Sequence, residues 1–165
     1  MGVASLRGKL VHRKILYVDS ASSRMLVISE NVLEKRAWNT RSAGYYSQSC
    51  ICDYLASTHG YLSASAFLTT YSLDTESQIL NVDTSRDDIV IGSGDEKLFL
   101  LSASEVSTYF GTNSKTASSD GEAASWGLRT FDTSDVKAGN VNASGDVSCD
   151  DPSTSLGLRP ACDYS

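Results

Sequence analysis

The spacing of hydrophobic residues changes along the chain between the periods of strands and helices, so it predicts elements of both kinds. Runs rich in Val, Ile, Leu and Tyr predict strands over residues 9–19 and 25–29. Apolar side chains at helical spacing predict a short helix over residues 49–55. Weaker patterns of the same kind predict a helical turn around residues 62–67 and another over residues 74–79.

One helix is predicted by its start signal as well as by its apolar face. Ser102 follows a run of four apolar residues, 98–101, which itself predicts a buried strand. Glu105 stands three residues after Ser102, and this spacing forms a capping box at a helix N-terminus. We therefore predict a helix over residues 103–110, with its apolar side chains facing the core.

Beyond this helix the chain becomes mostly Ser, Thr, Asp, Gly, Asn and Ala, interrupted by short apolar islands. The pattern from residue 111 to residue 165 predicts short strands joined by long polar loops. Loops carried by a rigid scaffold are where binding residues concentrate. We therefore expect the functional surface in this part of the chain.

Length and charge narrow the class of protein. A chain of 165 residues suits a single domain, here taken as residues 1–165. Residues 1–41 hold eight Lys or Arg against three Asp or Glu, whereas residues 120–165 hold three against eight. Because nucleic-acid surfaces need clustered Lys and Arg, the acidic C-terminal third argues against a nucleic-acid partner.

Membrane and export signals are not visible in the sequence. No apolar run approaches the roughly 18 residues of a membrane span, and residues 1–10 have no apolar segment typical of a secretory signal. We expect no membrane span. The compartment stays open, because the lack of a signal fits a cytoplasmic protein as well as a protein exported by another route.

The residues that usually carry catalysis or bind metals do not form a recognisable motif. The four cysteines, which could pair in part or stay reduced, are Cys50, Cys52, Cys149 and Cys162. Their spacing does not match a zinc site, and no phosphate-binding glycine loop or serine-nucleophile motif is present. A weak calcium site from Asp146, Asp150 and Asp151 is a minor alternative without EF-hand spacing. We expect no enzyme activity, no cofactor and no metal.

Five sequence blocks, taken in order, resemble a bacterial and phage domain family. They are Arg36-Ala-Trp38, Ser49-Cys-Ile-Cys-Asp-Tyr-Leu55, Leu98-Phe-Leu-Leu-Ser-Ala-Ser-Glu105, Ser125-Trp-Gly-Leu-Arg-Thr130 and Gly157-Leu-Arg-Pro-Ala161. That family is similar to the C-type-lectin-like fold of formylglycine-generating enzymes. It also supplies variable proteins to diversity-generating retroelements, in which an error-prone reverse transcriptase changes the adenines of selected codons.

The resemblance implies a fold class of α+β, C-type-lectin-like, with short helices around a small twisted antiparallel sheet and much irregular loop. It also implies that the N- and C-terminal strands lie close together. The variable ligand-binding region would span about residues 126–161. The ligand implied is a protein or a cell-surface molecule, and the oligomeric state stays open.

The resemblance further separates candidate ligand-binding residues from framework residues. The candidates are Phe131, Asp132, Thr133, Ser134, Asp135, Lys137, Asp146, Ser148, Asp150, Asp151, Ser153 and Thr154. Most of them can be reached by changing the adenines of an Asn codon, and Lys137 is the exception. The framework positions are Trp126, Leu128, Arg129, Asn140, Val141, Gly145, Gly157, Arg159 and Pro160. We expect Arg129 and Arg159 to hydrogen-bond within the scaffold, each with one bidentate partner.

Two alternatives to a variable binding module remain. A formylglycine-generating type of enzyme would need a close pair of reactive cysteines and a groove for a peptide substrate. A structural component of a virion or cell surface would need no variable ligand at all. Because one fold hosts many functions, the resemblance alone does not separate them.

Overall fold

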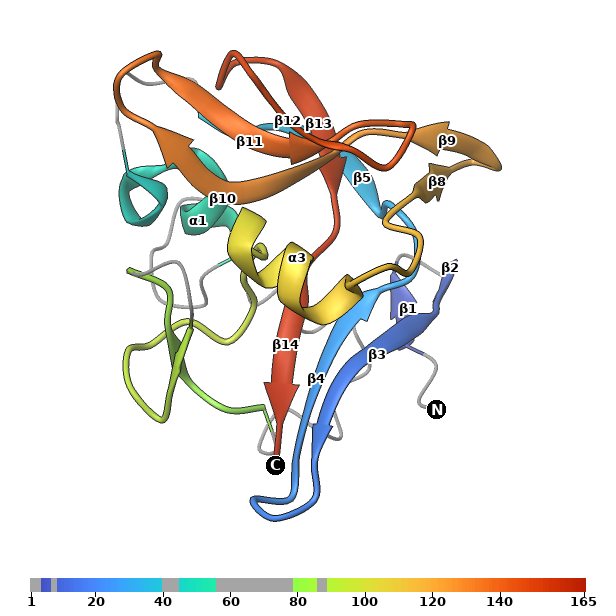
Figure 1. The fold of residues 1–165 in the computed structure, drawn as a ribbon, viewed down its shortest axis with the longest axis vertical. Coiled ribbons are helices and arrows are strands. Elements are labelled where there is room, and N and C mark those ends of the chain that lie inside the picture. Colours follow the sequence, from blue (N-terminus) through green and yellow to red (C-terminus); the bar gives the residue numbers. More distant parts are fainter. Residues whose placement is uncertain (1–3, 7–8, 40–44, 56–78, 86–88) are drawn as a thin grey trace.

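The fold is built mainly from antiparallel strands in several small sheets (Figure 1). A computed structural model describes residues 4–6, 9–39, 45–55, 79–85 and 89–165. Among these residues, no helix is both long and apolar enough to cross a membrane.

A three-stranded sheet joins the two ends of the chain. It consists of β3 (Arg13–Asp19), β4 (Arg24–Ser29) and β14 (Ala161–Tyr164), in the order β14-β4-β3. Both pairs are antiparallel. The prediction that the N- and C-terminal strands lie close together is therefore confirmed, and Figure 1 shows β14 beside β4.

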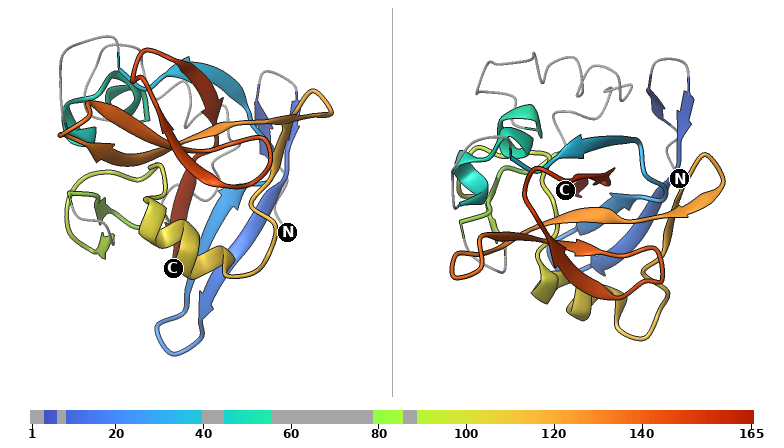
Figure 2. Two further views of the ribbon diagram at one scale, coloured as in Figure 1. Left: turned by 45° about the horizontal axis from the view of Figure 1, so that its top comes forward. Right: turned by 90° about the horizontal axis from the view of Figure 1, so that it is seen from above.

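A five-stranded sheet forms the other half of the molecule. Its strands are β5 (Glu34–Ala37), β10 (Trp126–Asp132), β11 (Lys137–Val141), β12 (Val147–Asp150) and β13 (Ser155–Leu158). The order is β12-β11-β10-β13-β5, so β12 and β5 are the outer strands. Among the described strands of this sheet, β10 and β13 pair in parallel and the other pairs are antiparallel. This sheet lies above the three-stranded one in Figure 1, and Figure 2 shows the two from other sides.

The remaining elements are short. They are β1 (Ala4–Leu6), β2 (Lys9–Val11), β6 (Val82–Asp83), β7 (Val90–Ile91), β8 (Ala117–Ser119), β9 (Glu122–Ala124), the 3-10 helix η1 (Tyr46–Gln48), and the helices α1 (Cys50–Leu55) and α3 (Ala103–Phe110). The predicted helix over 103–110 is confirmed with its capping box. The Ser102 hydroxyl oxygen accepts a hydrogen bond from the Glu105 backbone N–H at 3.1 Å. The Glu105 carboxylate accepts one from the Ser102 backbone N–H at 3.0 Å.

Two apolar clusters form the core. One contains Trp38, Leu98 and Leu100, and the other contains Phe99, Leu101 and Trp126. Successive side chains of an extended chain point to opposite sides. The side chains of residues 98–101 alternate between the two clusters in this way, so this segment is extended. It does not form the predicted strand, since Phe99 makes only an isolated bridge to Ala161.

The predicted fold class is wrong. Strand accounts for 43% of the structure and helix for 14%, so the molecule is mostly β with several sheets. It is not an α+β, C-type-lectin-like arrangement of short helices around one small twisted sheet. The C-terminal third is also less irregular than predicted, because β8 to β14 cover much of it. Its polar residues form strands because neighbouring strands supply their hydrogen-bond partners. Local composition does not indicate where such neighbours will be.

Other predicted elements compare as follows. The strand at 25–29 and the helix at 49–55 are confirmed as β4 and α1, whereas the strand at 9–19 is divided into β2 and β3. The helical turns predicted around 62–67 and over 74–79 lie outside the described residues, apart from Ile79. Ile79 is buried and bridges Tyr164.

Candidate binding surface

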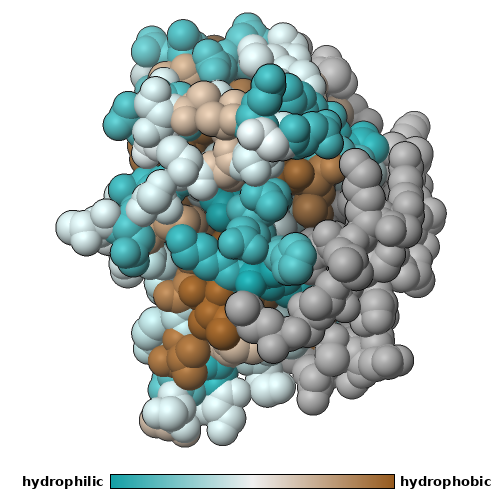
Figure 3. Space-filling view, turned by 90° about the vertical axis from the view of Figure 1, so that its right-hand side faces the viewer, coloured by the Kyte–Doolittle hydropathy of each residue, from teal (hydrophilic) through white to brown (hydrophobic). Residues whose placement is uncertain are grey.

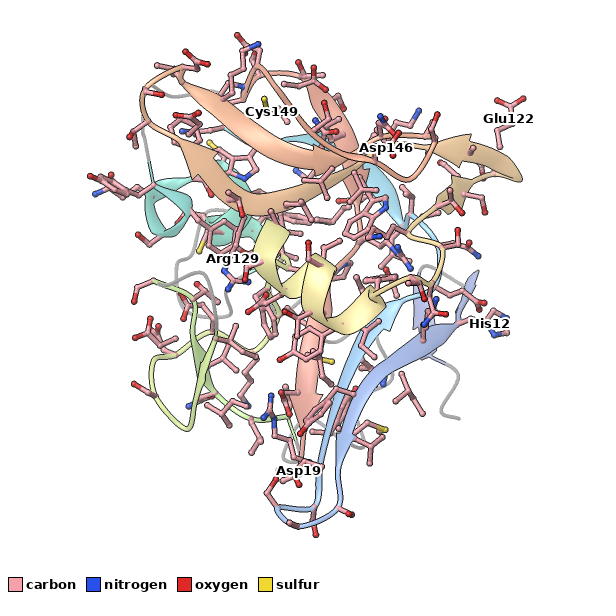
Figure 4. The ribbon with its side chains drawn as sticks, in the orientation of Figure 1. His12, Asp19, Glu122, Arg129, Asp146 and Cys149 are labelled. Atoms are coloured by element: carbon pink, nitrogen blue, oxygen red, sulfur yellow. The ribbon has the colours of Figure 1, made fainter. Side chains whose placement is uncertain are left out.

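Eleven of the twelve candidate ligand-binding residues are exposed, and Phe131 is half-buried. The eleven exposed residues come from three neighbouring stretches: the turn between β10 and β11 with the residue on each side of it, strand β12 with the residue before it, and the turn between β12 and β13. We call the residues of these stretches, 132–137 and 146–154, the acidic rim. Figure 4 shows Asp146 and Cys149 in the half of the molecule that holds the five-stranded sheet.

Strand register brings the separate stretches of the acidic rim together. Asp132 pairs with Lys137 across the β10–β11 turn, and the next residue of β11, Ala138, pairs with Asp150 of β12. The hydrogen bond from the Ser153 side chain is the largest cause that lowers the pKa of Asp151, and the charge of Lys137 adds to it. Asp132, Lys137 and Asp150 therefore share one end of the sheet, whereas Asp146 and Val147 lie at the other end of β12.

The rim is strongly acidic. Residues 131–154 contain five Asp and one Lys, with no Arg or Glu. The electrostatic potential of such a surface favours cationic groups on a ligand and disfavours anionic ones.

The first turn of the rim is held by its own carboxylate. Asp132 Oδ1 accepts from the Ser134 backbone N–H at 2.8 Å and from the Ser134 hydroxyl at 2.6 Å. These bonds lower the pKa of Asp132, with the Ser134 side chain as the largest cause. Asp132 therefore shapes the turn as well as carrying charge.

The turn between β12 and β13 repeats this arrangement. Asp151 Oδ1 accepts from the Ser153 backbone N–H at 2.8 Å and its hydroxyl at 2.6 Å, which lowers the pKa of Asp151. The Pro152 carbonyl accepts from the Asn39 backbone N–H at 2.8 Å. The shaping role of Asp132 and Asp151 was not predicted, although the shared D-x-S spacing is a signal for such turns.

Most framework residues of the resemblance are buried in the fold, and Gly145 is half-buried. The side chains of Trp126, Leu128, Arg129, Asn140, Val141 and Arg159 are all buried, with 4% or less exposed. Gly157 is buried as well, and a Cβ there would lie 2.6 Å from the Ser125 carbonyl oxygen. Only glycine allows this close approach of β13 to the chain before β10.

Arg129 forms a buried ion pair with Glu105. Its Nη2 donates to Glu105 Oε1 at 2.7 Å, and its Nη1 donates to Glu105 Oε2 at 2.5 Å. Both side chains are at most 2% exposed. The prediction of a bidentate scaffold partner is confirmed for Arg129, and the pair connects β10 to the first turn of α3.

Arg159 is held in a different way. Its Nε donates to the Ser29 carbonyl oxygen at 2.8 Å, and its guanidinium carbon lies 4.7 Å from the centre of the Trp126 ring. Burial lowers the pKa of Arg159 to about 10. The predicted bidentate partner is wrong here, since a single carbonyl bond and an aromatic face hold the side chain.

Phe131 contacts the core rather than standing free in the rim. Its ring stacks on Trp38 with 4.9 Å between ring centres and 19° between planes. Trp38 in turn donates from Nε1 to the Leu128 carbonyl oxygen at 2.9 Å. Phe131 therefore anchors the end of β10 and exposes only part of its ring.

The cysteines do not form a close reactive pair. None of the four belongs to a disulfide; Cys149 is exposed on β12, whereas Cys162 is buried on β14. Burial raises the pKa of Cys162 to about 11 and that of Cys52 to about 12. A disulfide between Cys149 and Cys162 is not formed.

Metal ligands are not assembled in the part of the chain that the structure describes, where no group of three His, Cys, Asp or Glu side chains is placed to hold an ion. The suggested calcium ligands Asp146, Asp150 and Asp151 are exposed along β12 and its flanks. Asp150 accepts instead from the Asn140 side chain at 3.0 Å, and Asp146 accepts from Asn142 through its backbone carbonyl at 2.8 Å.

Comparison with known proteins gives a family but no function. The family described as a domain of unknown function (DUF6273) matches residues 22–163, which is most of the chain. No curated protein and no solved structure matches. The match begins after β3 and includes both the framework residues and the acidic rim. The chain therefore belongs to the family of the domain of unknown function DUF6273.

Proposed function

We propose that this chain is a ligand-binding module that presents the acidic rim to a protein or cell-surface ligand. The observation that carries the proposal is the separation of exposed from buried positions. Eleven of the twelve candidate residues are exposed, while eight of the nine framework residues are buried and Gly145 is half-buried. Such a division lets the surface change without loss of the fold.

The composition of the rim suits recognition. Short polar side chains such as Ser, Thr and Asp lose little conformational entropy on binding and adapt to different partners. The two D-x-S turns hold the backbone of the rim in place before binding. Pre-organisation of this kind reduces the entropic cost of association.

We further propose that the rim residues are the diversified positions of a diversity-generating retroelement. The support is that most candidate residues are both exposed and reachable from an Asn codon by changes at adenines. The DUF6273 family match does not bear on this point.

The test is deep sequencing of the 3′ end of the gene in its host population. We expect substitutions to concentrate at codons 131–155, while the codons for Trp126, Gly157, Arg159 and Pro160 stay constant. Ligand screening would then compare several natural variants of the rim. Sparse and uniform variation over the whole gene would contradict diversification and leave a module with a fixed ligand.

A further inference from the structure

Strand β12 leaves one side of the five-stranded sheet open. Within the described residues only β11 pairs with it, and their register runs without a bulge from Val147 to Asp150. All four residues of β12 are exposed. Soluble proteins usually protect such an edge with Pro, Lys or a bulge, and the sequence Val-Ser-Cys-Asp contains no Pro or Lys.

The register determines which backbone groups face outward. The Asn142 N–H donates to the Asp146 carbonyl oxygen at 2.8 Å, so these opposite residues form a hydrogen-bonded pair. In an antiparallel ladder such pairs alternate with non-bonded ones. Ser148 therefore bonds to β11, whereas the N–H and C=O groups of Val147 and Cys149 point to the free edge.

In the part of the chain that the structure describes, β3 is an open edge of the three-stranded sheet, and it is built differently. On β3, Ile15, Tyr17 and Val18 are 41% to 60% exposed, and Figure 3 shows apolar surface on the lower half of this side of the molecule. The register of β3 with β4 shifts between Ile15 and Tyr17. This irregularity interrupts the row of outward backbone groups, which hinders the addition of a strand.

Charge decides what could pair with β12. The acidic rim surrounds the strand with five Asp against one Lys. A second copy approaching edge to edge would bring two such surfaces together, and like charges in close contact oppose pairing. A segment rich in Lys and Arg would instead find both backbone partners and opposite charge.

We propose that the free edge of β12 binds an extended, basic peptide segment as an additional strand. This inference rests on the proposed function and names the chemistry of the partner. Hydrogen bonds to Val147 and Cys149 would supply the backbone contacts, and the aspartates of the rim would select the basic side chains. Recognition by strand addition combines main-chain hydrogen bonds with side-chain specificity in this way.

The test uses the full chain and a ten-residue probe peptide of alternating Lys and Val or Thr, with blocked ends. Two control peptides match it: one carries Glu at each Lys position, and one carries N-methyl groups on alternate backbone amides. The N-methylated peptide keeps the positive charge of the Lys side chains but lacks backbone N–H groups needed to form the strand hydrogen bonds. Fluorescence anisotropy measures affinity, and hydrogen exchange measures protection of the Val147 and Cys149 amides.

We expect the Lys peptide to bind and to protect both amides, the Glu peptide not to bind, and the N-methylated peptide to bind at least about tenfold more weakly because hydrogen bonds are lost. Equal binding of the N-methylated and unmodified Lys peptides would overturn strand addition, while the rim would remain a binding surface. Absence of binding by the Lys peptide would overturn the basic partner. Neither result would alter the sequencing test of the proposed function.

A matched pair of variants locates the site. Cys149→Pro removes an outward N–H and leaves the Ser148 bonds to β11 in place, whereas Cys149→Ser keeps that N–H. We expect the proline variant to lose affinity by about fivefold to tenfold, as for one hydrogen bond, and the serine variant to bind normally. Equal affinities in two folded variants would place the peptide elsewhere. Should Cys149→Pro fail to fold, protection of the Cys149 amide in the unaltered protein decides the question.

Self-association is the remaining alternative occupant. The basic N-terminal segment of a second copy would also have the required charge. Light scattering that shows concentration-dependent dimers, abolished by added Lys peptide, would assign the edge to a second copy and overturn an external partner. A monomer at all concentrations, together with peptide binding, supports the proposal.

Discussion

At the scale of single residues, two buried arginines stabilise the scaffold by different means. Arg129 is neutralised by Glu105 in a bidentate pair, whereas Arg159 depends on one carbonyl and the face of Trp126. Each arginine lies in one of the sequence blocks of the resemblance, and these blocks do not indicate the difference. The two side chains should therefore respond differently to substitution.

Arg129→Met should lower the free energy of unfolding by about 3–5 kcal/mol, because Glu105 would be left as an uncompensated buried carboxylate. Urea denaturation measures the change. The double variant Arg129→Met with Glu105→Gln should lose less than the sum of the single changes. Lys137→Met on the exposed rim is the control and should change stability by no more than about 0.5 kcal/mol. An equal effect of the two Met substitutions would refute the role of the pair.

Arg159→Ala should lower the melting temperature, because it removes a charge-assisted hydrogen bond and a cation–π contact. These contributions together are worth about 2–4 kcal/mol in a buried setting. Thermal unfolding followed by circular dichroism measures the effect. An unchanged melting temperature combined with lost ligand binding would move Arg159 from the scaffold to the binding surface.

At the scale of elements, α3 is the part of the fold whose boundaries follow from local sequence. Its start is marked by Ser102 and Glu105, and its end by Gly111, which has a positive φ of 53°. Glu105 also forms long-range hydrogen bonds that no local pattern indicates. It also accepts from the Ile89 backbone N–H at 2.9 Å and pairs with Arg129, so the cap is tied to two distant segments.

Ser102→Ala should destabilise the protein by about 1 kcal/mol, because the backbone N–H of Glu105 loses its acceptor. Ser107→Ala, on the exposed side of the same helix, is the matched control and should be close to neutral. Chemical denaturation of both variants provides the comparison. Equal stabilities would show that tertiary contacts, and not the cap, hold the start of α3.

At the scale of the whole molecule, two apolar clusters lie on either side of a few shared segments. Residues 98–101 and strand β4 each send alternate side chains into one cluster and the other. This sharing joins the three-stranded and five-stranded sheets. Buried thiols belong to the arrangement, with Cys52 and Cys162 both in the cluster that contains Trp38.

Stability should fall at alkaline pH because of these thiols. Burial raises the pKa of Cys52 to about 12 and that of Cys162 to about 11, from an ordinary value of 9.0. The neutral form is favoured in the fold, so its contribution is fully present below pH 9 and is lost as pH rises through 11 and 12. Unfolding free energies measured at several pH values test this. The double variant Cys52→Ala with Cys162→Ala should show a weaker fall; an identical profile would rule the thiols out.

How much could be predicted differs between the parts of the site. The candidates among residues 132–135 and 148–154, without Cys149 and Pro152, were identified from their place between sequence blocks, and their exposure agrees with a surface role. The turn-forming role of Asp132 and the stacking of Phe131 on Trp38 were not predicted. The D-x-S spacing is a local signal for the turn at Asp132. The stacking of Phe131 on Trp38 joins residues more than ninety positions apart, so no local signal indicates it.

The sequence by itself determined the features that depend on neighbouring residues: the capped helix α3, the short helix α1, strand β4 and the division between polar and apolar segments. Only the tertiary structure decided which strands pair. It placed β13 between β10 and β5, and β14 beside β4. Strand pairing depends on hydrogen-bond partners and packing contributed from far along the chain, so similar local patterns fit many sheet orders. For the same reason the open edge of β12 became visible only once its single neighbour was known.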